Sequence, residues 1–556
     1  MRHLLVLAAF LAFVPPAAAQ RQMVAAAHPM AAEAGMAALR QGGTAVDAAI
    51  ATQMVLGLVE PQSSGIGGGA FLVFRSAEGR LRSWDGRETA PAAAQDNLFL
   101  NSAGQPMAFH DAAVGGRAVG APGVVAMLHE AHRAHGRLPW ASLFAPAIDL
   151  AERGFAISPR LAGAIRNDAA RLARDPATAA YFLAADGSPL PAGHVLKNPA
   201  YAHSLRLLAA QGPAPMYAGE IAEQIVAAVR GAAWNPGLLT ASDLANYRPV
   251  ERPVVCGPFR LYRVCGMGPP SSGGVAVLQI LGLLDHFALP DQAPFDLVAH
   301  LGVEAAKLAF ADRAAFLGDP DFVTVPVAGL IDPMYLTARA QLIDPARAGS
   351  FRPGNPPWRR AELRVPAEPL FEETGTSHVA IIDRFGHAVS MTTTIEDVFG
   401  ARIMAGGFLL NNQLTDFAFA PTADGRAVAN RVQGGKRPRS SMAPSIVERA
   451  DGGLHAAVGS PGGARIIGYV AKALVGMLAW NLEPQAAIDL PNVLSLGATA
   501  ELEAGTEAAA LAPALEARGQ RVMVRPLESG LHAVVVTPQG LRGGADRRRE
   551  GVALGE

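Results

Sequence analysis

The stretch that decides the fold is Gly375–Asp416, which reads GTSHVAIIDRFGHAVSMTTTIEDVFGARIMAGGFLLNNQLTD. It opens with a glycine followed by a hydroxyl residue, Thr376. The apolar pattern predicts one strand over residues 378–383 and a second over residues 388–395, joined by a Phe-Gly turn. The stretch is therefore expected to form a hairpin with a hydroxyl residue at its mouth.

A cut between Gly375 and Thr376 would give Thr376 a free α-amino group beside its hydroxyl. Such an amine has a pKa of roughly 7.7–8.0 and can act as general base at neutral pH. A threonine with its own N-terminal amine is a recognised activated nucleophile. Residues 346–375, just upstream, are rich in proline and arginine and predict a linker that fits a maturation site. Alone, however, Gly-Thr-Ser is far more often an ordinary loop-to-strand junction.

The composition excludes some functions. The 556 residues are 50% hydrophobic and carry a formal net charge of −1, with no basic stripe, so nucleic acid is not an expected partner. The glycine run Gly65–Gly69 lacks the Gly-Lys-Ser/Thr ending of a nucleotide-binding loop. We interpret it as backbone that packs closely or bends tightly.

The N-terminus predicts export. Arg2 precedes an apolar segment, Leu4–Val14, and Ala17–Ala19 forms an A-x-A site with cleavage expected before Gln20. No later uninterrupted apolar run is long enough to span a bilayer. Residues 1–19 are therefore predicted to be a signal peptide, and the mature protein is expected to be secreted, to the periplasm, and not to span the membrane.

The two cysteines, Cys256 and Cys265, lie in the hairpin-like stretch VVCGPFRLYRVC. Export permits a disulfide. A turn at Gly257-Pro258, however, would not place the cysteines opposite each other, so the sequence favours two free thiols over a bond. Without nearby histidines at ligand spacing they do not predict a zinc site.

Further candidates for a polar site lie far apart in the sequence. Arg87 follows a strand predicted over residues 81–84, and its guanidinium could grip a carboxylate through two parallel bonds. Pairing with Asp85 or Glu88 is the alternative.

Gly462 and Gly463 precede a helix predicted over residues 464–480, and the unpaired N–H groups at a helix start attract negative charge, as in an oxyanion hole. A Gly-rich turn is the simpler interpretation.

Together these segments resemble the γ-glutamyltransferase (γ-glutamyl transpeptidase, glutathione hydrolase) family of the N-terminal-nucleophile hydrolase superfamily. The resemblance spans nearly the whole mature chain. The segments that carry it are AHPMAAEAGMAALRQGGTAVDAAIA (27–51), EPQSSGIGGGAF (60–71), DGRETAP (85–91), GAPGVVA (120–126), LTASDLANYRP (239–249), PPSSGG (269–274), ADRAAFLGDPDF (311–322), GTSHVAIID (375–383), GGFLLNNQLTDF (406–417), KRPRSSMAPSIV (436–447) and GSPGGARI (459–466).

The resemblance implies a role for each matching residue. It implies that Thr376 is the nucleophile, released by self-cleavage after Gly375, and that Thr394 hydrogen-bonds it and assists maturation. It implies an oxyanion hole at Gly462 and Gly463. The implied substrate contacts are Arg87, Ser440 and Ser441 for the α-carboxylate and Gln413 and Asp416 for the α-ammonium.

The resemblance also implies a four-layer αββα sandwich of mixed α and β structure, built jointly by a large subunit, residues 20–375, and a small subunit, residues 376–556. The implied reaction passes a γ-glutamyl group from donors such as glutathione to water or to an amino acid or dipeptide. No metal and no cofactor are expected.

The chain departs from the family pattern at three places. Glu396 stands where an asparagine is usual; its carboxylate would repel a substrate carboxylate or strengthen the ammonium site. The segment between Asp416 and Ser440 is short and lacks tyrosine, which predicts a reduced lid, an open site and more hydrolysis. Gln62 replaces a common histidine, with no clear consequence.

Two other functions compete with this one. A related acylase would accept glutaryl-type side chains of β-lactam precursors, but it would not need Gln413 or Asp416 to bind an ammonium. An inactive binding or scavenging protein would not need Thr376, Thr394 and the glycine pair together. Both alternatives are therefore less favoured than a γ-glutamyl enzyme.

Overall fold

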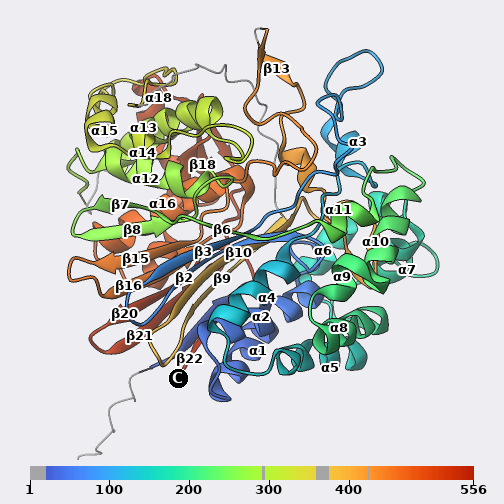
Figure 1. Cartoon of the computed structure of the whole chain (residues 1–556). Coiled ribbons are helices and arrows are strands. Elements are labelled where there is room, and N and C mark those ends of the chain that lie inside the picture. The colour runs from blue at the N-terminus through green and yellow to red at the C-terminus, as the bar shows by residue number, and fades with distance from the viewer. Residues whose placement is uncertain (1–19, 291–294, 358–374, 424) are drawn as a thin grey trace, which may run out of the picture.

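A computed structural model describes residues 20–290, 295–357, 375–423 and 425–556. The predicted signal peptide and most of the predicted linker lie outside these ranges. The described residues form four layers in the order helix, sheet, sheet, helix (Figure 1). This confirms the predicted αββα sandwich.

The central sheet contains the stretch on which the sequence analysis was built. In spatial order the strands are β22 (Val552–Gly555), β1 (Met23–Ala26), β9 (Gly375–Ile382), β10 (Ala388–Glu396), β2 (Gly69–Arg75), β3 (Leu81–Gly86) and β6 (Val250–Arg252). Successive side chains of these strands point alternately into two hydrophobic cores. On β9, for example, Val379 and Ile381 face one core, and Ala380 and Ile382 face the other. Because both faces are covered, β9 and β10 are buried along their whole length, including their threonine, serine and histidine side chains.

The second sheet packs on the central sheet and is antiparallel throughout. At their interface the Ser390 hydroxyl donates to the Val458 carbonyl at 3.0 Å. Its strands, in spatial order, are β21 (Gly540–Ala545), β20 (His532–Thr537), β16 (Leu454–Gly459), β15 (Ser445–Arg449), β8 (Tyr262–Gly266) and β7 (Val255–Phe259).

Helices cover the outer face of each sheet (Figure 1). On the central sheet lie α1 (Pro29–Arg40), α2 (Ala45–Val59) and α4 (Val124–His135). The second sheet is covered by α12 (Gly273–Leu284), α13 (Phe295–Phe316) and α16 (Ile466–Leu478). Helix α2 is almost entirely buried, as its apolar sequence predicts, because further helices pack on its outer side.

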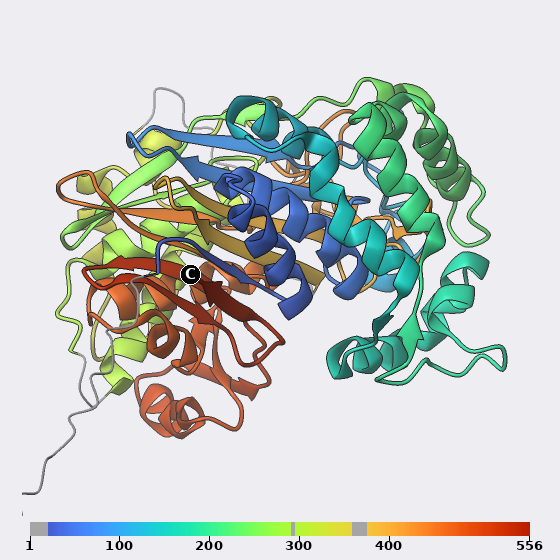
Figure 2. The same ribbon diagram turned by 90° about the horizontal axis from the view of Figure 1, so that it is seen from below.

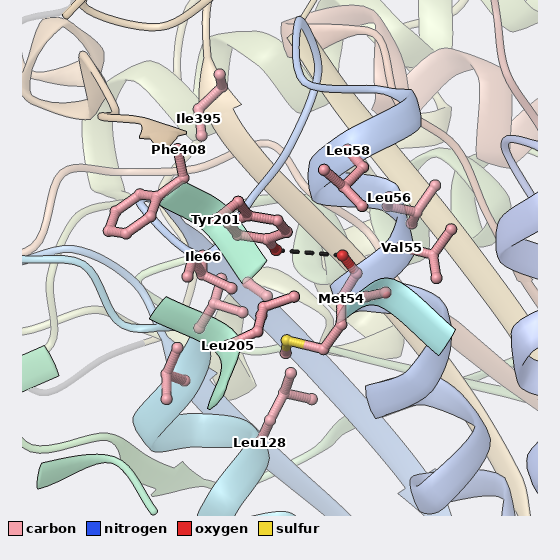
Figure 3. Packing of buried hydrophobic residues seen from close by; sticks show 14 of the residues in the cluster. Met54, Val55, Leu56, Leu58, Ile66, Leu128, Tyr201, Leu205, Ile395 and Phe408 are labelled. Carbon is pink, nitrogen blue, oxygen red and sulfur yellow. Dashed lines mark hydrogen bonds between the residues drawn. The ribbon is translucent and has the colours of Figure 1, made fainter. Parts of the chain in front are cut away.

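Those further helices lie beside the sandwich. Figure 2 shows them as the cyan to green group on one side, opposite the red C-terminal strands. Tyr201 of α8 ties this group to α2, because its hydroxyl donates to the Met54 carbonyl at 3.1 Å among packed leucines and Phe408 (Figure 3). The group comprises α5 (Ala145–Arg153), α6 (Pro159–Leu172), α7 (Pro176–Phe182), α8 (Pro199–Gln211), α9 (Ala214–Ala218) and α10 (Glu220–Arg230).

The expectation of two free cysteines is wrong. Cys256 and Cys265 form a disulfide and face each other directly across β7 and β8. The predicted turn residues, Gly257 and Pro258, belong to β7, and the chain reverses instead at Arg260-Leu261. Arg260 takes the positive φ of 53° that this tight turn requires.

The glycine run before β2 packs closely, as predicted. A Cβ at Gly67 would overlap the Leu409 carbonyl, and one at Gly68 would overlap the Thr394 carbonyl. By contrast, the C-terminal stretch LRGGADRRREG reads as a basic, solvated tail in the sequence but is integrated into the fold. It contributes β21, leads into β22 and buries Asp546 completely.

Candidate active site

Thr376 and Thr394 lie directly opposite each other on β9 and β10. The Thr376 hydroxyl donates to Thr394 Oγ1 at 3.0 Å, and the Thr394 hydroxyl donates to the Gly375 carbonyl at 2.7 Å. Both threonines are buried. A hydroxyl that could attack and a carbonyl that could be attacked are thus linked through one residue. The arrangement can polarise the Gly375–Thr376 peptide bond.

A bulge after Thr394 shapes the end of β10. The pairing register shifts between Thr394 and Glu396, and Glu396 adopts a positive φ of 81°, which is unusual for a side chain of its size. The Glu396 N–H donates to Thr394 Oγ1 at 2.8 Å, and its buried carboxylate accepts from the Asn412 amide. Asn412 therefore links the nucleophile strand to the segment that carries the predicted ammonium ligands.

That segment is a short 3-10 helix, η2 (Gln413–Asp416). The Asp416 carboxylate forms a close ion pair with Arg87 and accepts from the Gln413 amide at 3.0 Å. Tertiary structure thus joins the residue predicted to bind the substrate carboxylate to those predicted to bind its ammonium. The alternative partners of Arg87 are secondary, since Glu88 lies 3.9 Å from its guanidinium and Asp85 accepts from the backbone N–H of Arg87 rather than from its guanidinium.

Arg87 is fully buried at the end of β3. Its Nε donates to the Pro438 carbonyl at 3.1 Å, and Nη2 reaches the Arg439 carbonyl at 3.3 Å. Nη1 has no hydrogen-bond partner among the described residues. Burial raises the pKa of the neighbouring Glu88 to about 8, although Arg87 acts in the opposite direction. Glu88 is then mostly neutral at pH 7, which leaves the Arg87 charge to Asp416 and to a ligand.

Ser440 and Ser441 follow the carbonyls that Arg87 contacts, and both are buried. The Ser441 hydroxyl accepts from the Arg313 guanidinium at 2.8 Å. The backbone here is fixed by Ser272, whose hydroxyl donates to the Ser440 carbonyl at 2.6 Å. Neither Arg313 nor Ser272 is predicted from the sequence to have a role, although both lie in segments that carry the family resemblance.

Gly462 and Gly463 connect the end of β16 to a short 3-10 helix, η3 (Gly463–Arg465), which leads into α16. Their φ values of 129° and 57° lie in the left-handed region that favours glycine. A Cβ on Gly459, the last residue of β16, would overlap the ring of His378 on β9. The glycine pair therefore follows a strand end that is packed two residues from Thr376.

Arg549, from the C-terminal segment, is a contact that the sequence analysis missed. Its Nη1 donates to the Thr376 carbonyl at 3.1 Å and its Nη2 to the Glu528 carbonyl at 3.3 Å. Burial, and then the proximity of Arg160, lower the pKa of Arg549 to about 10. It remains a cation at neutral pH, close to the predicted nucleophile. Only the run of three arginines near the C-terminus could have drawn attention to it.

A cavity of about 670 Å³ adjoins this position, and both Gly462 and Arg549 line it. Within the described ranges, no group of three or more His, Cys, Asp or Glu side chains is arranged to hold a metal ion. None of the helices in the same ranges has the length and apolar character needed to cross a membrane.

Comparison with known proteins gives a consistent family. The family model described as "Gamma-glutamyltranspeptidase" matches residues 31–556. A relative named glutathione hydrolase proenzyme, from Bacillus subtilis strain 168, is 35% identical over 549 residues, covering 96% of this chain and 91% of the relative. One named acylase ACY 1 proenzyme, from Pseudomonas sp. strain SE83, is 37% identical over 550 residues, covering 97% and 94%.

Among solved structures, a cephalosporin acylase from Bacillus halodurans superimposes with a TM-score of 0.84 at 27% identity. The match covers 98% of this chain and 99% of that chain. The comparison therefore extends over the whole fold, including both sheets.

Proposed function

The chain belongs to the γ-glutamyltranspeptidase family, and we propose that it is a self-processing γ-glutamyltransferase and glutathione hydrolase with Thr376 as its nucleophile. The observation that carries the proposal is the chain of hydrogen bonds from Thr376 through Thr394 to the Gly375 carbonyl. The N-terminal-nucleophile chemistry needs a hydroxyl and a scissile carbonyl in this relation.

Maturation proceeds within the hairpin. The Thr376 oxygen adds to the Gly375 carbonyl carbon, and the developing oxyanion is stabilised by the Thr394 hydroxyl. The C–N bond then breaks, the hydroxyl proton passes to the Thr376 nitrogen, and an ester remains. Water hydrolyses this ester, releasing the Gly375 carboxylate and regenerating the Thr376 hydroxyl beside a free amine.

Cleavage would give residues 20–375 and 376–556 as the large and small subunits. The central sheet interleaves them, since β1 of the large subunit lies between β22 and β9 of the small one. In the second sheet β8 and β15 cross the same boundary. Because separation would break inter-strand hydrogen bonds in both sheets, we expect the subunits to remain together as a heterodimer.

Turnover uses the two sides of the polar site differently. The donor α-carboxylate binds Arg87 with Ser440 and Ser441, and its α-ammonium binds Asp416 and Gln413. Oγ of Thr376 adds to the γ-carbonyl carbon while its amine takes the hydroxyl proton. The amide C–N bond breaks, the ammonium protonates the leaving amine, and a γ-glutamyl ester forms. Water or an amine acceptor then attacks this ester, and the acyl group leaves Thr376.

Two further groups complete the site. The N–H groups at Gly462 and Gly463 would stabilise the tetrahedral oxyanion; losing one such donor costs roughly a hundredfold to a thousandfold in rate. Glu396 would act on the ammonium side, because Asn412 links its carboxylate to η2. The short, tyrosine-free segment after Asp416 favours water as acceptor.

A related acylase activity is the second candidate, supported by the relative named acylase ACY 1 and by the cephalosporin acylase structure. The Arg87–Asp416 ion pair, with Gln413 donating to the same carboxylate, favours a γ-glutamyl donor instead, since a glutaryl group has no ammonium to balance Asp416. The predicted signal peptide supports export to the periplasm.

The experiment compares the purified protein with the Thr376→Ala variant on a denaturing gel. We expect two bands that become one in the variant, and mass spectrometry should place the new N-terminus at Thr376. Chromophore release from a γ-glutamyl anilide and from a glutaryl anilide then separates the two activities. A well-folded chain that stays uncut would overturn the proposal.

A further inference from the structure

The 670 Å³ cavity beside Thr376 is separate from the γ-glutamyl subsite. Gly462 and Arg549 line it, whereas Arg87, Asp416 and the two serines do not. A donor held by its zwitterionic end at Arg87 and Asp416 would place its scissile amide at Thr376. What lies beyond the amide, on the side of Gly462, is the leaving group. The cavity is therefore the space available to that group.

One helix forms a wall of this cavity. The residues of α6 that line it recur at helical spacing and make a single stripe. Small residues occupy the middle of the stripe and an arginine stands at each end. The eleven steps from Arg160 to Arg171, at 1.5 Å each, give a length of about 16 Å, which matches roughly five residues of extended peptide. The stripe consists of Arg160, Gly163, Ala164, Asn167, Asp168 and Arg171.

The charges of the wall are ordered by depth. Among the described residues that line the cavity, six are arginines and three are carboxylates. Arg171 donates to Asp168 at 2.5 Å, and the exposed fractions of the two side chains are 33% and 6%. Arg160 donates to Glu60 at 2.8 Å, with exposed fractions of 19% and 1%. The carboxylates thus lie behind the arginines and orient them.

Each of these two guanidiniums uses only Nη1 in those ion pairs, while a guanidinium has five N–H donors in a planar fork. The remaining donors can bind carboxylates that enter the cavity. Neutral Gly163, Ala164 and Asn167 leave room for a chain between the two arginines.

We propose that this cavity is a subsite for an acidic oligopeptide, bound as the leaving group of the γ-glutamyl donor with its carboxylates on Arg160 and Arg171. The inference rests on the proposed function for the identity of the leaving group. It goes beyond that function by assigning a substrate class: γ-glutamyl peptides several residues long with acidic side chains, in preference to neutral ones of equal length.

The test compares two donors on the processed enzyme, γ-glutamyl-Gly-Glu-Glu-Glu and the C-terminal amide of γ-glutamyl-Gly-Gln-Gln-Gln, by release of glutamate. The readout is the charge preference, defined as kcat/KM for the acidic donor divided by kcat/KM for the neutral donor; this is the ratio meant below. Asn167→Asp is nearly isosteric and adds a negative charge in mid-stripe, so it should lower the ratio about fivefold, and Asn167→Lys should raise it. Arg171→Gln should also lower it, and 0.5 M salt should diminish the preference.

Arg166→Gln is the matched control, because Arg166 is exposed on the same helix but does not line the cavity. Its ratio should equal that of the unmodified enzyme. If Arg166→Gln and Asn167→Asp change the ratio equally, or if neither Asn167 variant changes it, the subsite does not exist.

A binding measurement keeps the inference independent of turnover. A fluorescent Gly-Glu-Glu-Glu peptide and its glutamine counterpart are titrated into the uncut Thr376→Ala chain. We expect tighter binding of the acidic peptide, weakened by Asn167→Asp. Charge-independent binding would overturn the subsite even if γ-glutamyl anilide is cleaved. Failure to cleave the anilide, with charge-dependent binding retained, would instead refute the proposed function alone.

Discussion

Arg87 and Asp416, which the sequence analysis assigned to opposite ends of one substrate, form an ion pair with each other. The pair is nearly buried, with 0% and 11% of the two side chains exposed. A zwitterionic α-amino acid group can offer its carboxylate to Arg87 and its ammonium to Asp416. Each buried charge then still has an opposite charge beside it. A ligand with only a carboxylate would take Arg87 and leave Asp416 without a cation, which is costly at a buried site.

Asp416→Asn should therefore discriminate between donors. We expect kcat/KM for a γ-glutamyl anilide to fall by about a hundredfold, because a buried charge-assisted contact to the ammonium is lost. The value for a glutaryl anilide should fall less or rise. Asp451→Asn, at an exposed turn, serves as control. Equal losses for both substrates would show that Asp416 does not bind the ammonium.

Thr394→Val should slow self-cleavage. The variant removes the hydroxyl that contacts both Thr376 and the Gly375 carbonyl, and we expect the half-life of the uncut chain to lengthen by about a hundredfold. Thr394→Ser should process at a rate closer to that of the original chain. The measurement is the time course of band conversion on a denaturing gel.

Thr393→Val provides the control for that experiment. Thr393 is adjacent on β10 and equally buried, but its hydroxyl has no hydrogen-bond partner among the described residues. It should process normally and fold at least as stably, because no hydrogen bond is lost. If the Val substitutions at 393 and 394 slow cleavage to the same extent, the role of Thr394 is not specific.

Acidification should destabilise the fold through His532. This residue is fully buried, and burial lowers its pKa to about 4; Asp546 opposes this shift and Arg549 adds to it. An unfolded histidine titrates near 6.5, so between these values the unfolded chain binds more protons and stability falls as the pH is lowered. The loss from pH 7 to pH 5 should be about 2 kcal/mol.

His532→Phe should flatten that part of the pH profile, as measured by urea unfolding at a series of pH values. His203→Gln is the matched control, because His203 is exposed on α8. It should leave the slope as it is. An unchanged slope in His532→Phe would place the acid sensitivity in other groups.

Reduction of the disulfide should lower the melting temperature. Cys256 and Cys265 are 9 positions apart, and a loop of that length corresponds to about 2–3 kcal/mol in the chain-entropy account. We expect dithiothreitol to destabilise the protein and the Cys256→Ala/Cys265→Ala double variant to match the reduced form. The double variant should not respond to the reductant, and a response would indicate another cause.

The sequence by itself determined the local and patterned features of this protein. Short runs of consecutive residues specify the alternation in β9 and β10 and the threonine at the start of β9. The same holds for the glycines that allow close backbone approach. The ordered motifs were enough to predict the αββα sandwich. These features follow from short-range sterics and from burial on two faces, so a linear pattern can reveal them.

Only the tertiary structure decided which distant residues meet. Asp416 pairs with Arg87 across 329 positions, and Arg549 reaches the Thr376 carbonyl across 173. The cysteine pairing depended on where one hairpin turns, and the C-terminal stretch became buried because β22 completes the central sheet. Such contacts depend on how the layers pack, and neither local conformational preference nor charge counting along the chain contains that information.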